Sequence, residues 1–410
     1  MAKITRRGFA GLCLGVAASG AVLGRSSDFG LADTKTSGSA ATVDQNPIRR
    51  RGTGLRAIDV SRASPGYTLF ASAADPTVYL IDLHGSVVHT WKMPYLPGLY
   101  GYLTDAGTLF YNGQIPNASF LGKVPSKGGV ALEADWDGKI LWEVRHRDHH
   151  HDGRLLRNGN VILLCATELP ASVAKKVQGG RAGTEENGKM WADYLVEMSK
   201  DGETVWEWRA WEHLDLAKDV ITAVQDNRAE WTHGNAVIEL PDGDLLVSFR
   251  NISTIIKIRG QNGEIVWRMG APPLSGQHAP APLANGNILV FDNGPHRLDQ
   301  SFPFSRVIEI NPATNQIVWK YQEANPYNLF SPRISNAQRL PNGNTLINEG
   351  FFGRFFEVTA EGEVVWEYVN PHFGPASDPP KSQRNHVFRA YRYTEAEIAR
   401  ARQSANGDHA

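Results

Sequence analysis

Six short hydrophobic runs along the chain each follow a turn glycine, with the alternation expected of strands. Each run is five to eight residues long and ends before the next polar turn. They are PGYTLFA at Gly66, AGTLFYNG at Gly107, NGNVILL at Gly159, DGDLLVSF at Gly243, NGNILVF at Gly286 and NGNTLIN at Gly343.

A second phrase alternates with the first, namely a Gly or Asn turn followed by a strand with an aromatic residue four positions on. Its copies are GKILW at Trp142, GETVW at Trp206, GEIVW at Trp267, NQIVW at Trp319 and GEVVW at Trp366. GSVVH at His89 is a degenerate sixth copy, with Trp91 two residues later.

The six alternations predict the fold. Separations of 64, 61, 52 and 47 residues between successive tryptophans from Trp142 to Trp366 suit four-stranded sheets with loops of variable size. A β-sandwich uses similar hairpins but does not repeat such a phrase six times. The sequence therefore predicts an all-β, six-bladed β-propeller of four-stranded blades over residues 55–393, with the tryptophans packed between blades. A helical pattern appears only in the predicted helical or disordered tail, 394–410.

The N-terminus carries a targeting pattern. Arg6 and Arg7 precede an uncharged run of 17 residues that ends at Gly24, which is typical of a twin-arginine export signal spanning residues 1–32. The alternative is a membrane anchor, for which this run is short. A disordered Ser/Thr/Gly/Arg-rich leader is expected at 33–54. We therefore expect a periplasmic or secreted protein that uses the twin-arginine machinery and has no stable membrane anchor.

Composition and net charge argue against some classes of partner and against an internal disulfide. The chain has 410 residues and a formal net charge of −1, which argues against nucleic acid as a partner. Cys13 lies in the predicted signal, so Cys165 is the single cysteine of the mature chain and no internal disulfide can form. We expect Cys165 to be a buried, inert thiol.

Polar residues recur eight positions before the turn glycine. In blades three to six they are His151, Asn235, His278 and Ser335. The first strand of a propeller blade lines the central channel, so these side chains should meet at one channel mouth. The alternative interpretation is a polar mouth whose imidazoles only bind water and backbone.

Other histidines flank this register. His150 precedes His151, and His233 stands two residues before Asn235, whereas His149 should be structural. Several imidazoles near one axis are also compatible with a metal, an interpretation that we place below a metal-free site. We therefore predict no cofactor.

Arginines could complete an anion site. Arg297 ends FDNGPHR and offers a planar guanidinium suited to an oxyanion such as sulfate. Arg333 and Arg354 of the sixth repeat are weaker candidates, and Asp292 and Asn293 are expected to brace the turn.

The segments EWTHGNAVIELPDGDLLVSFR, GQHAPAPLANGNILVFDNG and SNAQRLPNGNTLI, with the GEIVW-like strands between them, resemble the bacterial aryl-sulfate sulfotransferase family over residues 60–393. The resemblance implies a six-bladed propeller that moves a sulfuryl group from a phenolic sulfate ester to a phenol through a sulfated histidine. It assigns His233, His278 and Arg297 to the active site.

The sequence departs from the family at the sulfated histidine. That residue is expected in a segment later than the arginine, yet no histidine occurs between His296 and His372, and Asn336 stands in SPRISNAQRL instead. The nucleophile has therefore moved to His150 or His151, of which His151 keeps the eight-residue register, or the pocket does other work.

These considerations give a predicted site. Its predicted catalytic residues are His151, His233, His278 and Arg297. Its predicted substrate-binding residues are His150, Asn235, Arg333, Asn336 and Arg354. Two alternatives remain: an exported propeller that binds a ligand or a protein without turnover, and a quinoprotein-like oxidoreductase, which the G-x-x-x-W phrase would suit but which has eight blades.

Overall fold

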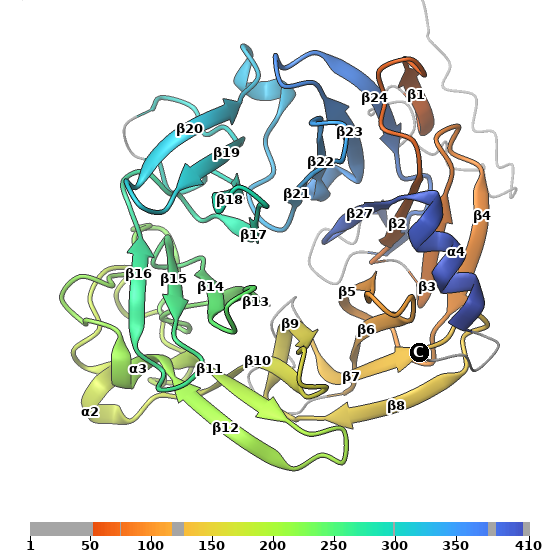
Figure 1. Cartoon of the computed structure of the whole chain (residues 1–410). Helices are drawn as coiled ribbons and strands as arrows, with labels where there is room; N and C mark the ends of the chain where they lie inside the picture. Colours follow the sequence, from red (N-terminus) through yellow and green to blue (C-terminus); the bar gives the residue numbers. More distant parts are fainter. Residues whose placement is uncertain (1–51, 74, 117–126, 298–299, 376–382, 405–410) are drawn as a thin grey trace, which may run out of the picture. The chain divides into compact units, whose positions relative to one another are not determined.

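Six antiparallel sheets form a ring around a central channel, and in each sheet one strand lies next to the channel (Figure 1). The computed structural model describes residues 52–404 except 74, 117–126, 298–299 and 376–382. The predicted export signal, with its anchor alternative, and most of the predicted leader lie outside the described residues. The prediction of a six-bladed propeller with four-stranded blades is confirmed, whereas the quinoprotein architecture needs eight blades.

The strands of each blade follow one another from the channel outward. Blade one contains β27 (Ala390–Tyr393), β2 (Tyr67–Ala71), β3 (Thr77–Ile81) and β4 (Val87–Lys92). Blade two contains β5 (Pro97–Leu103), β6 (Leu109–Gln114), β7 (Gly129–Ala134) and β8 (Ile140–Arg145). Blade three contains β9 (His149–Leu155), β10 (Val161–Glu168), β11 (Trp191–Met198) and β12 (Thr204–Arg209).

The second half of the ring repeats this order. Blade four contains β13 (Gly234–Glu239), β14 (Leu245–Phe249), β15 (Thr254–Ile258) and β16 (Ile265–Met269). Blade five contains β17 (His278–Pro282), β18 (Ile288–Asp292), β19 (Arg306–Asn311) and β20 (Gln316–Tyr321). Blade six contains β21 (Asn336–Arg339), β22 (Thr345–Glu349), β23 (Arg354–Val358), β24 (Val364–Val369) and the additional β1 (Gly54–Ile58).

Both ends of the described chain contribute a strand to the ring. The C-terminal β27 is the innermost strand of blade one, where it pairs antiparallel with β2. The N-terminal β1 pairs with β24 as a fifth, outermost strand of blade six, which the sequence pattern did not predict. Blades one and six are thus each completed by a distant part of the chain, which covers sheet edges that would otherwise be open.

The elements outside the blades are short. They are α2 (Ala171–Ala174), α3 (Ala210–His213), η2 (Pro326–Asn328), η3 (Gly350–Phe352), β25 (Gly374–Pro375), β26 (Gln383–Arg384) and α4 (Glu395–Gln403). Helix α4 begins with a capping box between Thr394 and Glu397, as TEAE at its start dictates. No helix in the described part of the chain has the length and apolar character to cross a bilayer.

Tryptophans of the fourth strands, counted from the channel, join neighbouring blades. Indole N–H groups donate to backbone carbonyls of the next blade from Trp91 to Asp135, from Trp208 to Gly263, from Trp319 to Ala360 and from Trp366 to Leu83. Trp267 donates to the Asn315 side chain in the same way. The predicted packing between blades is therefore confirmed.

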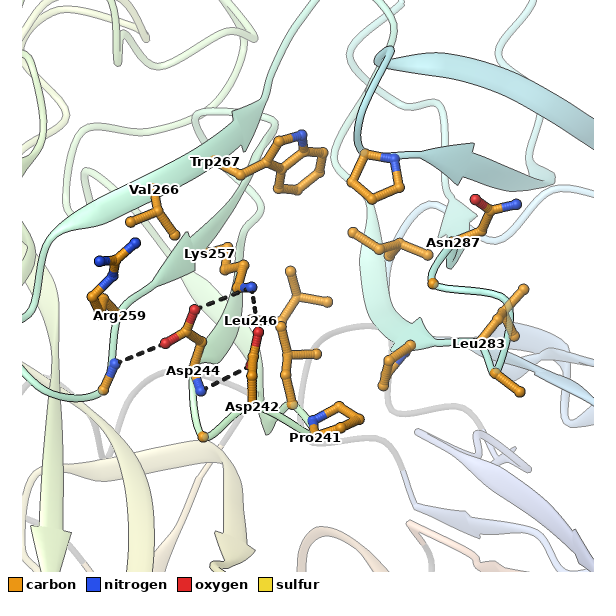
Figure 2. A pocket seen from close by; sticks show the side chains of 18 of the residues that line it. Pro241, Asp242, Asp244, Leu246, Lys257, Arg259, Val266, Trp267, Leu283 and Asn287 are labelled. Atoms are coloured by element: carbon orange, nitrogen blue, oxygen red, sulfur yellow. Dashed lines mark hydrogen bonds and ion pairs between the residues drawn. The ribbon is translucent and has the colours of Figure 1, made fainter.

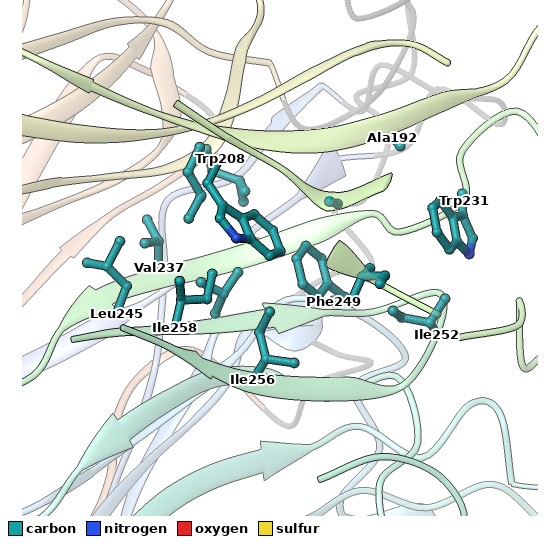
Figure 3. Close-up of a cluster of buried hydrophobic side chains, with 14 of the residues drawn as sticks. Ala192, Trp208, Trp231, Val237, Leu245, Phe249, Ile252, Ile256 and Ile258 are labelled. Atoms are coloured by element: carbon teal, nitrogen blue, oxygen red, sulfur yellow. The ribbon is translucent and has the colours of Figure 1, made fainter. Parts of the chain in front are cut away.

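Blade three uses a different tryptophan from the one that the repeat phrase aligned. The indole of Trp208 bonds to blade four, although the phrase selects Trp206. Side chains two residues apart share one face of a strand, so either tryptophan could face the neighbour. Figure 3 shows Trp208 against Phe249, in the hydrophobic cluster that fills the space between blades three and four.

Candidate active site

The channel ends of several innermost strands have an irregular backbone. Non-glycine residues with positive φ occur there in blades two to six: Leu99 (144°), His151 (51°), His233 (50°), Ala279 (48°), Ile334 (57°) and Ser335 (89°). The pairing register shifts at the same place in blades two to five. Such conformations cost on the order of 1–3 kcal/mol each and persist where the surrounding structure enforces them. The bulges redirect side chains at one end of the channel.

In blade three, His150 and His151 at the channel end of β9 form a series of contacts with Asp193 of β11. The Nδ1 atoms of His150 and His151 are 2.5 Å apart, and His150 Nε2 lies 2.9 Å from Asp193 Oδ1. Asp193 Oδ2 also accepts hydrogen bonds from the Thr232 hydroxyl and from the Gly234 N–H (2.7 Å). These bonds fix the carboxylate. Burial opposes ionisation of Asp193, but its bond to His150 keeps the pKa below the usual value.

This chain sets the tautomer of His151. If His150 carries its proton on Nε2, the nitrogen 2.9 Å from the Asp193 carboxylate, its Nδ1 accepts the proton that His151 carries on its own Nδ1. His151 Nε2 then holds a lone pair, and it has no hydrogen-bond partner among the described residues. Burial, followed by the charges of His233 and His150, places the pKa of His151 well below its ordinary value. The ring is therefore neutral at physiological pH.

His233 stands beside His151. The two rings meet edge to face with centroids 4.7 Å apart. His233 Nδ1 is 2.8 Å from Glu230 Oε2, and the His233 side chain retains 17% of its exposure. A carboxylate on Nδ1 orients an imidazole and fixes the proton on that nitrogen, which leaves Nε2 to face the site.

His278 has no free ring nitrogen in this conformation. Its Nδ1 is 2.8 Å from Asn293 Oδ1 and 3.1 Å from the Gly276 carbonyl, so Nδ1 is the donor. Its Nε2 accepts the N–H of Ile334 at 3.1 Å. Burial and the positive charge of Arg250 hold the pKa of His278 well below its ordinary value. Through these hydrogen bonds, His278 joins blade five to blade six.

Phe388 and Arg389 lie beside the histidines and contact the inner strands of several blades. The Phe388 ring centroid lies 6.2 Å from that of His151 and 6.4 Å from that of His278. Arg389 is 1% exposed and donates to Asp152 Oδ2 (2.9 Å), to the Tyr100 hydroxyl (2.7 Å) and to the Asn235 carbonyl (3.0 Å). Sequence reasoning missed both residues, because only ring closure brings the C-terminal segment to the axis.

His149 is part of the framework, as expected. It is buried, and its Nδ1 accepts the backbone N–H of Gly129 at 3.1 Å. Burial, then the charges of His150 and His146, lower the pKa of His149 to about 3. Cys165, also buried, has its pKa raised by burial, which agrees with the predicted inert thiol.

The three predicted arginines are each paired. Arg297 Nη2 contacts Asp292 Oδ2, and its guanidinium lies over Phe304 at 4.9 Å. Arg354 binds Glu367 (3.1 Å) and Glu349 (3.2 Å) across neighbouring strands. Arg333 lies over the ring of Phe351 at 5.2 Å. Asp292 and Asn293 brace the loop as expected, since Asp292 accepts from Arg306 (2.8 Å) and Asn293 donates to Ser331 and Ile334 carbonyls.

The predicted asparagines contact backbone. Asn235 Nδ2 donates to the Gln277 carbonyl at 2.8 Å. Asn336 binds Ala390 as a peptide group would, with both the donated and the accepted bond at 2.9 Å. Gln338 repeats this arrangement on Arg392 (2.9 and 2.7 Å). Two amide side chains of β21 thus hold the closing strand β27.

Three carboxylates of the site were not predicted: Asp193, Glu230 and Asp226. Glu230 and Asp226 lie in the long connection between α3 and β13, which is held to the β10–β11 loop by short bridges. Glu230 stands three residues before His233, a spacing that could have indicated the pair. In the part of the chain that the structure describes, no group of three or more His, Cys, Asp or Glu side chains is arranged to hold a metal ion.

A cleft of about 1070 Å³ lies at the other end of blades four and five (Figure 2). Its walls come from the β13–β14 and β17–β18 turns, whereas His233 and His278 stand at the opposite ends of β13 and β17. Figure 2 shows Lys257 bound to both Asp242 (2.7 Å) and Asp244 (3.0 Å). We assign no chemistry to this cleft.

Fold and site define a six-bladed β-propeller with interacting histidines at one channel mouth. Residues 124–371 match the model of the arylsulfotransferase (ASST) family, and the chain belongs to this family. None of the curated proteins matches the chain in sequence.

Solved structures share low identity with the chain. A protein of unknown function from Bacteroides caccae is 15% identical, with 80% of this chain and 98% of that chain covered and a TM-score of 0.48. Hydrazine synthase from Kuenenia stuttgartiensis is 12% identical, with 73% and 78% covered and a TM-score of 0.44.

Proposed function

We propose that the protein transfers a sulfuryl group from a phenolic sulfate ester to a phenolic acceptor, with His151 as the group that becomes sulfated. The observation that carries this proposal is the Asp193–His150–His151 chain, which leaves His151 Nε2 with a lone pair. Membership of the arylsulfotransferase family supports the reaction class.

In the first step, His151 Nε2 attacks the sulfur of the ester, and the bond between sulfur and the aryl oxygen breaks. The electron pair of that bond leaves on the phenolate. The attacking imidazole gains positive charge, and its Nδ1 proton can move toward His150, whose other nitrogen faces Asp193. The carboxylate therefore stabilises charge where it develops.

His233 handles the second proton. Glu230 holds the ring through Nδ1, and His233 Nε2 donates a proton to the departing phenolate. In the second step the now neutral His233 takes the proton of the acceptor phenol. The acceptor oxygen attacks the sulfur, the nitrogen–sulfur bond breaks, and its electron pair returns to His151. Donor and acceptor use the same position in turn, and no nucleotide is consumed.

The test is a trapping experiment. Wild-type protein incubated with 4-nitrophenyl sulfate without acceptor should release 4-nitrophenol and yield a sulfated peptide containing His151, detected by mass spectrometry. His151→Ala should lose both the modified peptide and turnover, by at least about a thousandfold. His149→Gln is the control, since His149 lies in the same strand but binds only framework groups, and it should remain active.

An active His151→Ala enzyme, or a sulfated peptide from another segment, would reject this nucleophile.

The second candidate function is ligand binding without turnover. It is favoured by the use of Asn336 for strand pairing where the family resemblance placed a nucleophile. Binding of aryl sulfates by a wild-type protein that turns over none of them would establish that alternative.

A further inference from the structure

Arg250 lies directly across from His233. It follows the last residue of β14, and its backbone N–H donates to the His233 carbonyl at 3.0 Å. The Arg250 side chain retains 18% of its exposure. A permanent cation is thus held at the histidine end of blade four, at the last position of the segment EWTHGNAVIELPDGDLLVSFR.

Only part of the Arg250 guanidinium is used by the protein. Nη1 donates to Asp226 Oδ2 (3.2 Å) and to Asn251 Oδ1 (2.9 Å). Nε and Nη2 have no hydrogen-bond partner among the described residues. An arginine has five N–H donors in a planar fork, so the side of the fork that suits an oxyanion remains available.

A buried network fixes the partner of Arg250. Asp226 Oδ2 is also 3.0 Å from His296 Nε2, and His296 Nδ1 lies 3.1 Å from Thr222 Oγ1 and 3.2 Å from Ser253 Oγ. Burial opposes ionisation of Asp226, but His296 and Arg250 keep its pKa below the usual value. Asp226 therefore remains a carboxylate that orients the guanidinium.

The charge of Arg250 acts on the histidine cluster. After burial, this charge is the leading cause of the lowered pKa of His278. Arg297 differs in its surroundings, because its partner Asp292 also binds Arg306 (2.8 Å) and its guanidinium lies against Phe304. The contacts of Arg297 are those of a residue that braces the β18–β19 loop.

We infer that Arg250, rather than Arg297, is the arginine that holds the sulfuryl oxygens while the group passes between phenolic oxygen and His151. This assignment rests on the proposed function. As the bond from sulfur to the aryl oxygen breaks and the bond to His151 Nε2 forms, the three remaining oxygens keep their negative charge. The free Nε–H and Nη2–H donors of Arg250 bind two of these oxygens, and no proton is transferred from the guanidinium.

Turnover of 4-nitrophenyl sulfate with phenol tests this assignment. Arg250→Gln should lower kcat by roughly a hundredfold, which is typical for loss of one preorganised donor. Arg250→Lys keeps a cation for Asp226 but lacks the fork, so it should stay folded without rescuing turnover. Arg297→Gln should lose less than about tenfold. Arg339→Gln, which breaks a pair with Glu309 at the other end of β21, is the matched control.

Binding of 4-nitrophenyl sulfate is measured separately by calorimetry in a His151→Ala background, which cannot turn over. Adding Arg250→Gln should weaken binding at least about tenfold, whereas adding Arg297→Gln should not. Turnover lost by Arg297→Gln but kept by Arg250→Gln would overturn the assignment while the proposed reaction stands. A wild type without turnover would reject the reaction, and the binding experiment would still decide between the two arginines.

Discussion

The channel ends of blades three and six hold equivalent positions in the repeat and serve different purposes. Each has a residue with positive φ there, His151 in blade three and Ser335 in blade six. In blade three the redirected side chain of His151 is hydrogen-bonded to His150, which in turn lies next to the Asp193 carboxylate. In blade six the following residue, Asn336, binds the backbone of Ala390 in β27.

The difference follows from where the chain closes. The sheet of blade one receives its inner strand from the C-terminus, and this strand must be held beside β21 by side chains because it comes from a distant part of the sequence. An amide can donate and accept at once, as a peptide group does, and an imidazole with one proton has a different geometry. Blade six therefore uses its channel end for closure, while blade three is free to carry a reactive group.

The largest expected effect is on the blade-three chain. Asp193→Asn keeps the shape of the side chain but removes the charge that faces His150, and the amide can donate where the carboxylate only accepted. We expect turnover of 4-nitrophenyl sulfate to fall by roughly 10²–10⁴-fold, as when the orienting carboxylate of a catalytic histidine is neutralised. The folded protein should remain, which circular dichroism checks. Unchanged turnover would show that Asp193 only supports the fold.

The next effect concerns acid stability, which should depend on blade three and not on blade six. His149 and His151 have pKa values below the ordinary 6.5, so the unfolded chain binds more protons once the pH falls below about 6.5. The stability is complete above that pH and declines toward the folded pKa, about 3 for His149, by up to about 1.4 kcal/mol per pH unit for each histidine.

Chemical unfolding between pH 7.5 and 5 measures this slope. His149→Gln removes one titrating group and should flatten the decline, whereas Asn336→Ala should leave the slope unchanged because no titrating side chain is lost. Equal slopes in wild type and His149→Gln would contradict the assignment of a neutral, buried His149.

The smallest expected effect is on closure. Asn336→Ala removes two hydrogen bonds to Ala390 and should cost about 2 kcal/mol of unfolding free energy. Asn336→His, which restores an imidazole in the segment where the family resemblance expects one, should destabilise similarly without increasing turnover. Gln338→Ala is a matched variant on the same strand. A more active Asn336→His enzyme would show that blade six can serve both purposes.

The sequence predicted the blades because strand two and strand four of each carry a repeated phrase with a physical basis, a turn glycine in one and an aromatic residue in the other. It also predicted which residues enter the channel, since strand one has a fixed offset from that glycine. His151 has this offset, and it lies against His233, which stands two residues before the equivalent position of blade four.

The partners of these residues were not predicted, although the three-residue spacing between Glu230 and His233 could have indicated one pair. Asp193, Glu230 and Arg250 lie on a strand, in a long connection and in a turn, and each resembles an ordinary surface charge in sequence. The partners of Arg354 could not be predicted either. Glu349 and Glu367 lie next to it only because of how neighbouring strands pair. The β1 strand was missed because its pairing with β24 spans most of the chain.

The placement of Phe388 and Arg389 has a consequence for biosynthesis. A ribosome releases the histidines of blades three to five well before these two residues, at a rate of roughly 5–20 residues per second. An unfinished chain can fold its middle blades, but it lacks Phe388, whose ring lies beside His151. It also lacks β27, the inner strand of blade one. The candidate site therefore becomes complete only after Phe388, Arg389 and β27 have been made, so we expect the proposed activity only in chains that contain this segment.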